Sequence, residues 1–339
     1  MVIFGAGASY DSLARLPTDV IQYPDPAGQW RPPLANQLFD PRFGPYIQEF
    51  PQMHAVIPEL ENPIGGVEAV LERFQSEASE HSRRLNQLAA VRYYLQTMLS
   101  NCQSRWENQT RGVTNYKALL DRIEHRIRGD KLLVSFNHDT LLEEALTSTV
   151  GVKIEKMSDY LSTEYKVVKL HGSINWTHVV REPKFDLSGT EVDVAIRVID
   201  KAPQLDINPT FDLASRNITG RWGDHPIIPA LSIPVANKSV YECPEEQHQV
   251  LTDSLPNIDK VLVIGWKGGE KRFLDSMTER MNKRVRVLVV SSSEGSASEL
   301  IIKLQRSLGT GGDADFRAGK RGFSNTITSH EADEFLKTP

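Results

Sequence analysis

Short apolar segments that end in glycine, serine or polar residues recur along this 339-residue chain, and they constrain its fold more than any other feature. Helical patterns separate several of these segments, and alternating buried strands and helices are typical of a parallel sheet covered on both faces. The sequence therefore predicts an α/β fold with a doubly wound, mostly parallel, Rossmann-like sheet. We expect its buried strands at residues 2–4, 132–136, 167–170, 260–264 and 285–290.

A helical pattern interrupts this alternation between the first strand and the second. Residues 17–64 are rich in proline, which predicts a long loop with short helical pieces that could cover a ligand. Apolar residues then recur at helical spacing from residue 66 to residue 127 and predict three helices. We interpret residues 45–130, approximately, as an inserted loop and helical subdomain within a single domain that spans residues 1–339.

The second half of the chain combines an irregular region with further predicted strands and helices. Residues 176–225 look irregular apart from one strand expected at 191–200, and a second buried stretch begins at 226–229. Helices are expected at 245–255, 273–281 and 297–308. Residues 309–339 form a tail that is Gly-rich and basic at first and helical at its end. We expect its first part, up to residue 324, to be a mobile flap or an interaction segment.

Composition excludes several classes of protein. The formal net charge of -5 provides no overall basic field for nucleic acid, so the local basic clusters are interpreted as surface charge. No apolar run approaches the length needed to span a bilayer, and no secretory signal pattern opens the chain. The two cysteines, Cys102 and Cys243, fit a reducing cytoplasm and cannot build a four-cysteine zinc site. Cys243 and His248 are the only closely spaced soft ligands, so no metal is expected.

A glycine-rich segment follows the first strand directly and includes Gly5, Ala6, Gly7 and Ser9. Such a turn between a strand and a helix brings backbone N–H groups next to a phosphate. Tyr10 stands where the dehydrogenase fingerprint requires a third glycine. The segment therefore predicts a phosphate or dinucleotide loop of another type, with a plain strand-to-helix turn as the alternative. Because the first strand begins almost at the first residue, we expect the start of the domain to be unusual or incomplete.

Polar residues stand at the carboxyl ends of two further predicted strands. Asn137 and Asp139 follow one of them, and His171 and Gly172 follow the other. Ligands of open α/β sheets bind outside the carboxyl ends of the strands, and histidine suits proton transfer near neutral pH. Two alternatives remain open. His171 could be a structural histidine bonded to a loop carbonyl, and Asp139 could serve only as the N-cap of the next helix.

Two later strands also end in residues that suit a nucleotide. Gly265 and Trp266 follow the strand expected at 260–264, and Ser291 and Ser292 follow the strand expected at 285–290. Glycine and serine at strand ends could hold the phosphate and ribose of a nucleotide. We therefore expect all of these strand ends to line one crevice.

Taken together, these segments resemble the sirtuin family, and most closely its bacterial branch of NAD-cleaving proteins of anti-phage defence. Residues 5–9 are similar to the family's opening nucleotide loop, residues 135–139 to its Thr-x-Asn-x-Asp element, and residues 169–173 to its catalytic His-Gly segment. Trp176 fits the bacterial branch. Residues 264–266 correspond to a late glycine loop near the phosphates, and Ser291 and Ser292 to the strand end that meets the adenosine ribose. The zinc ribbon of deacylating members is missing, and residues 10–13 replace their continuation after the glycine loop.

The resemblance implies that NAD is the substrate and that its products are nicotinamide and ADP-ribose. His171 would be the general base, Asn137 would bond the ribose and place the attacking water, and Asp139 would hold the carboxamide or offset developing charge. Gly5, Ala6, Gly7, Ser9, Gly265, Trp266, Ser291 and Ser292 would complete the NAD site. The defence branch also implies a homo-oligomer and a hexameric DNA-translocating ATPase as partner. Transfer of ADP-ribose or an acyl group, and a module that only senses NAD or ADP-ribose, are the alternatives.

Overall fold

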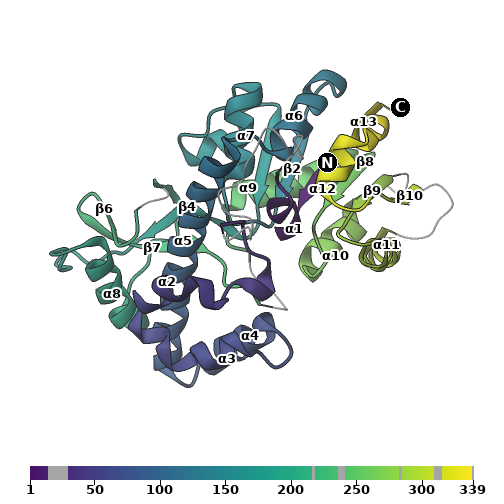
Figure 1. The fold of residues 1–339 in the computed structure, drawn as a ribbon. Coiled ribbons are helices and arrows are strands. Elements are labelled where there is room, and N and C mark those ends of the chain that lie inside the picture. Colours follow the sequence, from purple (N-terminus) through teal and green to yellow (C-terminus); the bar gives the residue numbers. More distant parts are fainter. Residues whose placement is uncertain (14–29, 216–217, 236–240, 282–284, 309–314, 338–339) are drawn as a thin grey trace.

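Six parallel strands form the central sheet of the molecule (Figure 1). The computed structural model describes residues 1–13, 30–215, 218–235, 241–281, 285–308 and 315–337. The order of the strands is β10-β9-β8-β1-β2-β3, and every pair in it is parallel. Their bounds are β1 Val2–Phe4, β2 Lys131–Ser135, β3 Tyr165–Lys169, β8 Lys260–Ile264, β9 Arg286–Val290 and β10 Asp315–Ala318.

This strand order is that of a dinucleotide-binding Rossmann sheet, with three strands on each side of a central reversal. The chain runs outward from β1 to β3 on one side and from β8 to β10 on the other. The reversal lies between β1 and β8, where Phe4 pairs with Ile264. The predicted α/β fold with a doubly wound parallel sheet is confirmed, and so are the five expected strands within it.

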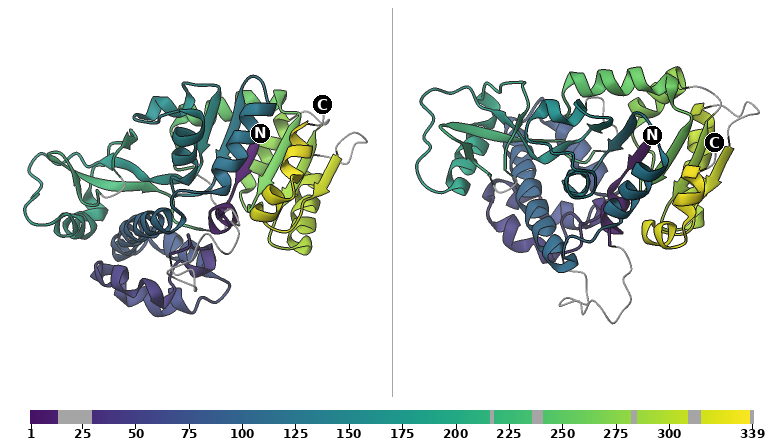
Figure 2. Two further views of the ribbon diagram at one scale, coloured as in Figure 1. Left: turned by 45° about the horizontal axis from the view of Figure 1, so that its top comes forward. Right: turned by 90° about the horizontal axis from the view of Figure 1, so that it is seen from above.

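Helices cover both faces of this sheet, as Figure 2 shows from two sides. Alternate strand residues face opposite ways, so Val2 and Phe4 belong to one core and Ile3 to the other. The first core is closed by α6 (Asn115–Arg126), α7 (Leu141–Val150), α12 (Phe323–Thr328) and α13 (Glu331–Lys337). The second is closed by α9 (Glu245–Ser254), α10 (Lys271–Arg280) and α11 (Glu294–Leu308).

A second sheet of four antiparallel strands extends from the carboxyl end of β3. Its order is β5-β4-β7-β6, with bounds β4 Gly172–Val179, β5 Asp212–Leu213, β6 Arg221–Trp222 and β7 His225–Leu231. Helix α5 (Ser82–Thr110) and helix α8 (Glu191–Lys201) both pack on the second sheet. His171 therefore stands where the chain leaves the parallel sheet for the antiparallel one.

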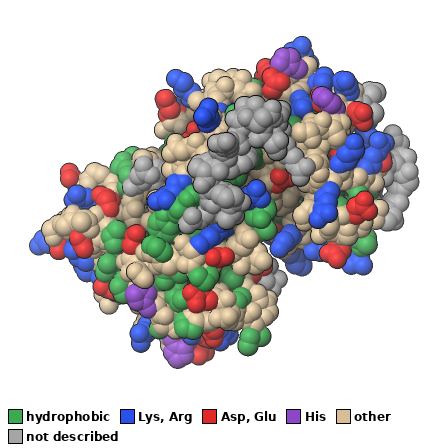
Figure 3. Space-filling view, viewed as in Figure 1, with side chains coloured by type: hydrophobic (Ala, Val, Ile, Leu, Met, Phe, Trp, Pro, Cys, Tyr) green, Lys and Arg blue, Asp and Glu red, His purple; other side chains and the backbone are tan. Residues whose placement is uncertain are grey.

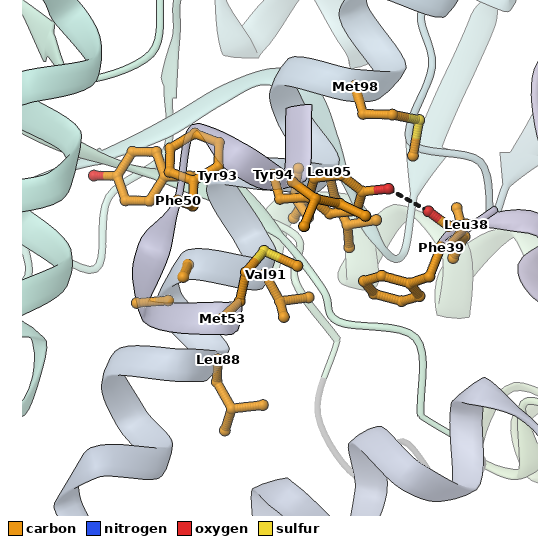
Figure 4. Close-up of a cluster of buried hydrophobic side chains, with 14 of the residues drawn as sticks. Leu38, Phe39, Phe50, Met53, Leu88, Val91, Tyr93, Tyr94, Leu95 and Met98 are labelled. Carbon is orange, nitrogen blue, oxygen red and sulfur yellow. Dashed lines mark hydrogen bonds between the residues drawn. The ribbon is translucent and has the colours of Figure 1, made fainter. Parts of the chain in front are cut away.

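Short helices from the proline-rich region pack on α5. They are η1 (Ala35–Gln37), η2 (Pro41–Phe43), α2 (Gly44–Gln48), η3 (Pro51–Val56), α3 (Ile57–Glu61) and α4 (Val67–Glu77). Figure 4 shows their core, in which Phe39 stacks on Tyr94 and Phe50 stacks on Tyr93. The Tyr94 hydroxyl donates to the carbonyl of Leu38. The expected helices and short helical pieces are present from residue 30 onward, and residues 14–29 lie outside the described part of the chain.

The three expected helices of this region do not share one core. Side chains of α4 and α5 pack with the short helices and the second sheet. Helix α6 packs instead on the parallel sheet, where Tyr116 and Leu120 contact the same core as Phe4. The expected subdomain boundary near residue 130 thus falls after a helix that covers the central sheet.

The strand expected at residues 191–200 is a helix, α8, and that prediction was wrong. Valines at alternate positions suggested a strand, but Val194, Ala195, Val198 and Ile199 are the buried residues, which is a helical spacing. Thr190 and Asp193 form a capping box, in which each side chain accepts the other's backbone N–H. This start signal was present in the sequence and outweighs the β-branched composition.

The mobile flap expected up to residue 324 was also wrong for residues 315–324, because β10 joins the parallel sheet and α12 packs on it. Residues 309–314 lie outside the described part of the chain. Two basic residues of this segment have local partners: Arg317 pairs with Asp315 at 2.5 Å, and the Arg321 Nε–H donates to the carbonyl of Ser292 at 2.5 Å. Acidic and basic side chains are intermixed on the face shown in Figure 3.

Gly172 makes the junction between the two sheets possible. Its φ of +73° lies in the left-handed region, and a Cβ added there would lie 2.1 Å from the carbonyl oxygen of Ala230. The close approach of β7 thus requires a residue without a side chain.

We therefore predict that Gly172→Ala lowers the free energy of unfolding by about 3 kcal/mol or more, because backbone strain and overlap add. Gly151→Ala is the matched control, since Gly151 has a φ of +72° and no neighbouring atom within 4 Å of an added Cβ. That variant should lose only about 1 kcal/mol. Urea unfolding of both variants measures the difference, and equal losses would contradict the role given to the β7 contact.

Candidate active site

Two glycine turns touch at the reversal of the sheet, one after β1 and one after β8. The Gly5 N–H donates to the carbonyl of Ile264 at 3.0 Å, and the Gly7 N–H donates to that of Gly265 at 3.1 Å. A Cβ on Gly7 would lie 2.8 Å from the Cα of Gly265, and a Cβ on Gly5 would lie 2.6 Å from the Cα of Trp266. These glycines are therefore required for packing, and two N–H groups of the predicted phosphate loop are already bonded within the protein.

The remaining residues of the first turn differ in exposure. Ala6 is exposed at the start of α1 (Ala6–Tyr10), whereas the Ser9 side chain is buried and directed at β2. The Ser9 hydroxyl lies 2.9 Å from the hydroxyl of Tyr116 and 2.9 Å from the amide nitrogen of Asn137. Ser9 thus links the turn after β1 to the turn after β2.

Asn137 is held from three directions at the end of β2. Its amide nitrogen donates to Ser9 and, at 3.1 Å, to the Tyr116 hydroxyl, and its backbone N–H donates to the Ser135 hydroxyl. The Asn137 side-chain oxygen is buried and has no hydrogen-bond partner among the residues that the structure describes. A buried acceptor without a partner is costly, so this oxygen is suited to a donor group of a ligand. Tyr116 of α6 was not predicted as a site residue, because its helical spacing indicated only a core side chain.

Asp139 lies behind Asn137, at the start of α7. Thr140 occupies the N-cap position rather than Asp139, but the Asp139 carboxylate still accepts the N–H of Leu141 at 3.2 Å. Burial raises the pKa of the Asp139 carboxyl, while the Lys169 ammonium and the Ser9 hydroxyl act in the opposite direction. Asp139 is therefore not the N-cap residue that the sequence suggested, although its carboxylate bonds an N–H of the first turn of α7 and also contacts Ser9.

A buried ion pair between Lys169 and Glu143 supports the turn between β2 and α7. The Lys169 side chain is fully buried, and its ammonium donates to the Glu143 carboxylate at 2.8 Å and to the backbone carbonyl of Asp139 at 2.5 Å. The Tyr160 hydroxyl also donates to Glu143, and the Trp176 indole donates to Tyr160. Trp176 therefore contributes to the support of β3 and α7. No contact of it with Asn137 or His171 appears among the interactions of the described residues.

His171 is oriented by a backbone carbonyl. Its Nδ1 lies 3.1 Å from the carbonyl oxygen of Phe136, which can only accept, so Nδ1 carries the proton. In the neutral imidazole, Nε2 is then the nitrogen with the free lone pair. Nε2 lies 3.6 Å from a carboxylate oxygen of Glu270. The structural alternative considered for His171, a bond to a loop carbonyl, is thus present, and it leaves the basic nitrogen directed toward another titratable group.

Glu270 and Trp266 were not recognised as partners from the sequence. Glu270 follows the glycine turn after β8 and is the N-cap residue of α10, and it accepts the Trp266 indole N–H. Trp266 stacks on Phe136 at 5.2 Å between ring centroids. The glycines at 268 and 269, just before Glu270, were the available signal, because such a turn can return a side chain to the crevice.

Ser291 and Ser292 lie at the same edge of the sheet, at the end of β9. The Gly322 N–H donates to the Ser291 carbonyl at 2.8 Å, and Arg321 bonds the Ser292 carbonyl. The C-terminal segment therefore contacts this strand end. The structure brings Gly5, Gly7, Ser9, Asn137, Asp139, His171, Gly265 and Trp266 together through the contacts described above, while Ser291 and Ser292 stand one strand further away.

Helix α5 braces the site from the side of the second sheet. The Gln103 side chain accepts the Thr140 N–H at 2.8 Å and donates to the Thr140 hydroxyl, and the Trp106 indole donates to the Ser12 hydroxyl at 2.9 Å. These two side chains hold the turn after β2 and the end of α1 respectively. The sequence predicted a helix in this region but assigned no role to Gln103 or Trp106, since periodicity cannot show which turns a helix contacts.

The described residues include neither a cluster of metal ligands nor a membrane-spanning helix. No group of three or more His, Cys, Asp or Glu side chains there could hold a metal ion. Burial raises the pKa of both cysteine thiols, Cys102 and Cys243, to about 12, so neither is ionised near neutral pH. No helix in the described ranges is both long and apolar enough to cross a bilayer.

Comparisons with known proteins found structural similarity only. No protein-family model matches the chain, and no curated protein matches its sequence. One similar solved structure is the crystal structure of a Sir2 homologue in complex with NAD, with a TM-score of 0.40 and 11% identity over 99% of this chain and 88% of that one. Another is a Sir2 homologue mutant in complex with 2′-O-acetyl ADP-ribose, with a TM-score of 0.41 and 13% identity over 99% and 89%.

The buried ion pair beneath the site yields a first prediction for this region. Lys169→Met should lower the free energy of unfolding by about 3–5 kcal/mol, because it leaves the Glu143 carboxylate buried beside no cation. Replacing both residues, as Lys169→Met with Glu143→Leu, should recover part of that loss. Lys166→Met on the same strand is the control, since Lys166 is partly exposed and bonds a backbone carbonyl. Urea unfolding measures all of these variants, and a Lys169→Met protein as stable as the wild type would contradict the prediction.

The raised pKa of Asp139 yields a prediction about pH. A carboxyl whose folded pKa is above its unfolded value of 3.8 contributes stability that is complete below that value and is lost as pH rises through the folded pKa. Asp139→Asn does not titrate, so the free energy of unfolding of this variant relative to the wild type should increase as pH rises from about 4 to about 7. Asp224→Asn, at an exposed turn, is the control. A constant difference for Asp139→Asn across this range would show that burial does not penalise the carboxylate.

Proposed function

We propose that this protein is an NAD glycohydrolase that cleaves NAD to nicotinamide and ADP-ribose. The observation that carries the proposal is the position of Asn137 and His171 at the carboxyl ends of two neighbouring strands, β2 and β3, close to the reversal between β1 and β8. Dinucleotides bind across the crevice at such a reversal, outside the carboxyl ends of the strands. The sirtuin-like order of motifs in the sequence supports the same reaction.

Cleavage of NAD requires little assistance from the protein at the leaving group. Nicotinamide is cationic at its ring nitrogen in NAD and leaves as a neutral molecule, so no general acid is needed there. Positive charge develops on the ribose instead, as in glycoside hydrolysis. An enzyme must therefore hold the ribose and deprotonate a hydroxyl or water near its reacting carbon.

The two central residues have properties that suit these tasks. The Asn137 side-chain oxygen is a buried acceptor that a ribose hydroxyl or the attacking water could satisfy. Nε2 of His171 is the basic nitrogen of the neutral ring, since Nδ1 donates to Phe136. We assign His171 as general base, Asn137 as the residue that positions the ribose and water, and Asp139 as support for the carboxamide or for the developing charge.

The remaining residues of the proposed NAD site are assigned from their positions at the strand ends and from the sequence resemblance. Ala6 of the first glycine turn and Gly265 and Trp266 of the second would lie along the phosphates, and Ser291 and Ser292 would meet the adenosine ribose. Gly5 and Gly7 contribute by letting the two turns touch, rather than by offering their own N–H groups. No metal is part of the proposal.

The wider biological role rests on the sequence resemblance alone. We propose depletion of NAD in the cytoplasm during anti-phage defence, by a homo-oligomer coupled to a DNA-translocating ATPase. Transfer of ADP-ribose or an acyl group is the second enzymatic candidate, and the absence of the four cysteines of a zinc ribbon disfavours it. A module that only senses NAD or ADP-ribose is the non-enzymatic candidate, and release of nicotinamide distinguishes it from an enzyme.

The test is the rate at which purified protein releases nicotinamide from NAD. His171→Ala should slow release by roughly 10²–10⁴-fold, the usual contribution of one acid–base group, while NAD binding weakens far less. Asn137→Ala should slow it at least roughly 10²-fold. The double variant should be little slower than either single variant, because the residues act as a unit.

His178→Ala is the matched control for this test. His178 is also buried, and it too bonds a backbone carbonyl and faces a glutamate, but it lies on β4 of the second sheet. It should lower the melting temperature while preserving activity per folded molecule. If His171→Ala behaves in the same way, His171 is structural and the proposed mechanism fails.

A further inference from the structure

We propose that Glu270 is a positioning residue that fixes the His171 imidazole and stabilises its protonated form. Its catalytic use rests on the NAD cleavage proposed above, but the electrostatic pairing itself does not. The two residues come from segments far apart in the sequence: His171 lies in the turn after β3, and Glu270 lies at the start of α10.

The first observation is that the imidazole lies between two oxygen acceptors. Nδ1 donates to the Phe136 carbonyl at 3.1 Å, and Nε2 lies 3.6 Å from the Glu270 carboxylate. The second distance exceeds a direct hydrogen bond but is well within the range at which a carboxylate favours the charged form of a histidine. Both side chains are largely withdrawn from solvent, with 7% of the His171 side chain and 17% of the Glu270 side chain exposed, which limits screening of the pair.

The second observation is that the carboxylate is itself held in place. The Trp266 indole N–H donates to the other oxygen of Glu270, and the backbone carbonyl of Glu270 accepts the first N–H groups of α10, from Phe273 and Leu274. The group that faces His171 is therefore anchored by a tryptophan side chain and by a helix start.

Aromatic packing closes this arrangement into a ring of contacts. The Phe136 ring stacks on Trp266 at an interplanar angle of 4° and meets the edge of His171 at 5.1 Å between centroids. Phe136 thus orients His171 through its carbonyl and Trp266 through its ring, while Trp266 orients Glu270. A shift of any member would change the distance between the carboxylate and Nε2.

The proposed step is balanced as follows. The bond between the ribose and the nicotinamide nitrogen breaks, its electron pair stays on nicotinamide, and a water oxygen bonds the ribose carbon. His171 Nε2 takes the proton of that water and becomes an imidazolium beside the Glu270 carboxylate. The proton is then released to solvent, which restores the neutral ring. Glu270 changes no bond and acts through charge and orientation.

Other titratable groups also lie near His171 in the described part of the chain. The His138 ring lies 6.1 Å from that of His171 between centroids, and Glu242 donates its backbone N–H to the carbonyl of Leu170 while its carboxylate faces His178 and Arg92. Asp139 and Lys169 are engaged in the support of α7. The cations that follow Glu270 are directed elsewhere: Lys271 pairs with Asp275, and Arg272 lies over the Tyr241 ring.

The deciding experiment is an NMR titration of the His171 ring in the wild type and in Glu270→Gln, with the resonance assigned by comparison with His171→Ala. Glutamine keeps the shape of the side chain but removes its charge, so the titration midpoint of His171 should fall by about one pH unit. Glu270→Asp, which retains the charge, should restore most of the midpoint. Glu279→Gln, an exposed residue of α10, is the matched control and should leave it unchanged. An unchanged His171 midpoint in folded Glu270→Gln would overturn the inference.

The rate of nicotinamide release tests the catalytic use of the pair. Glu270→Gln should slow release by roughly tenfold or more and move the acid limb of the pH–rate profile to lower pH, because the base loses its proton at lower pH. In a His171→Ala background the same change should have little further effect. A lower melting temperature with an unmoved acid limb would reduce Glu270 to a structural residue. A wild type that releases no nicotinamide would count against the proposed function, while the titration would still decide the pairing.

Discussion

The contact between the glycine turns after β1 and β8 is the constraint on which the rest of the site depends. Two backbones approach so closely there that an added Cβ on Gly5 or Gly7 would overlap the other turn. The contact joins the two halves of the sheet at their carboxyl edge, where the strand order reverses. Because this approach fixes α1, it also fixes Ser9, and through Ser9 it sets the position of Asn137.

The parallel sheet alone does not complete the site, since parts added to it hold its most polar turns. Helix α5 bonds Thr140 and Ser12 with side chains three residues apart, Gln103 and Trp106. At the other end of the chain, Ser324 of α12 donates to the Asp11 carboxylate at 2.7 Å, next to the first glycine turn. A long helix and the C-terminal segment therefore brace the same edge from two sides. Side chains held in this way lose little freedom on binding, which is what a preorganised site requires.

Two buried pairs of titratable side chains lie near this edge of the sheet, and they differ in how closely their partners approach. The Lys169 ammonium and one carboxylate oxygen of Glu143 are held by several hydrogen bonds and support the turn before α7, while the other oxygen of Glu143 is buried without a partner among the described residues. Glu270 and His171 lie further apart, at 3.6 Å, in an aromatic surrounding. The first arrangement fits a structural ion pair, because its charged atoms are in direct contact and the Lys169 ammonium also bonds a backbone carbonyl. The second leaves room for a change of protonation, and it is this difference that directs attention to His171 rather than to Lys169.

The sequence by itself determined the local elements and the strand ends, because those follow from short-range properties. Apolar runs of strand length, the glycine after His171 and the periodic helices were all predictable, and so was the clustering of Asn137, Asp139 and His171, since parallel strands end at one edge. Only the tertiary structure decided the rest. β10 took an edge of the sheet that its glycine-rich surroundings did not suggest. Tyr116 and Glu270 reach the site from helices distant in the sequence, and no local pattern encodes which turns such side chains meet.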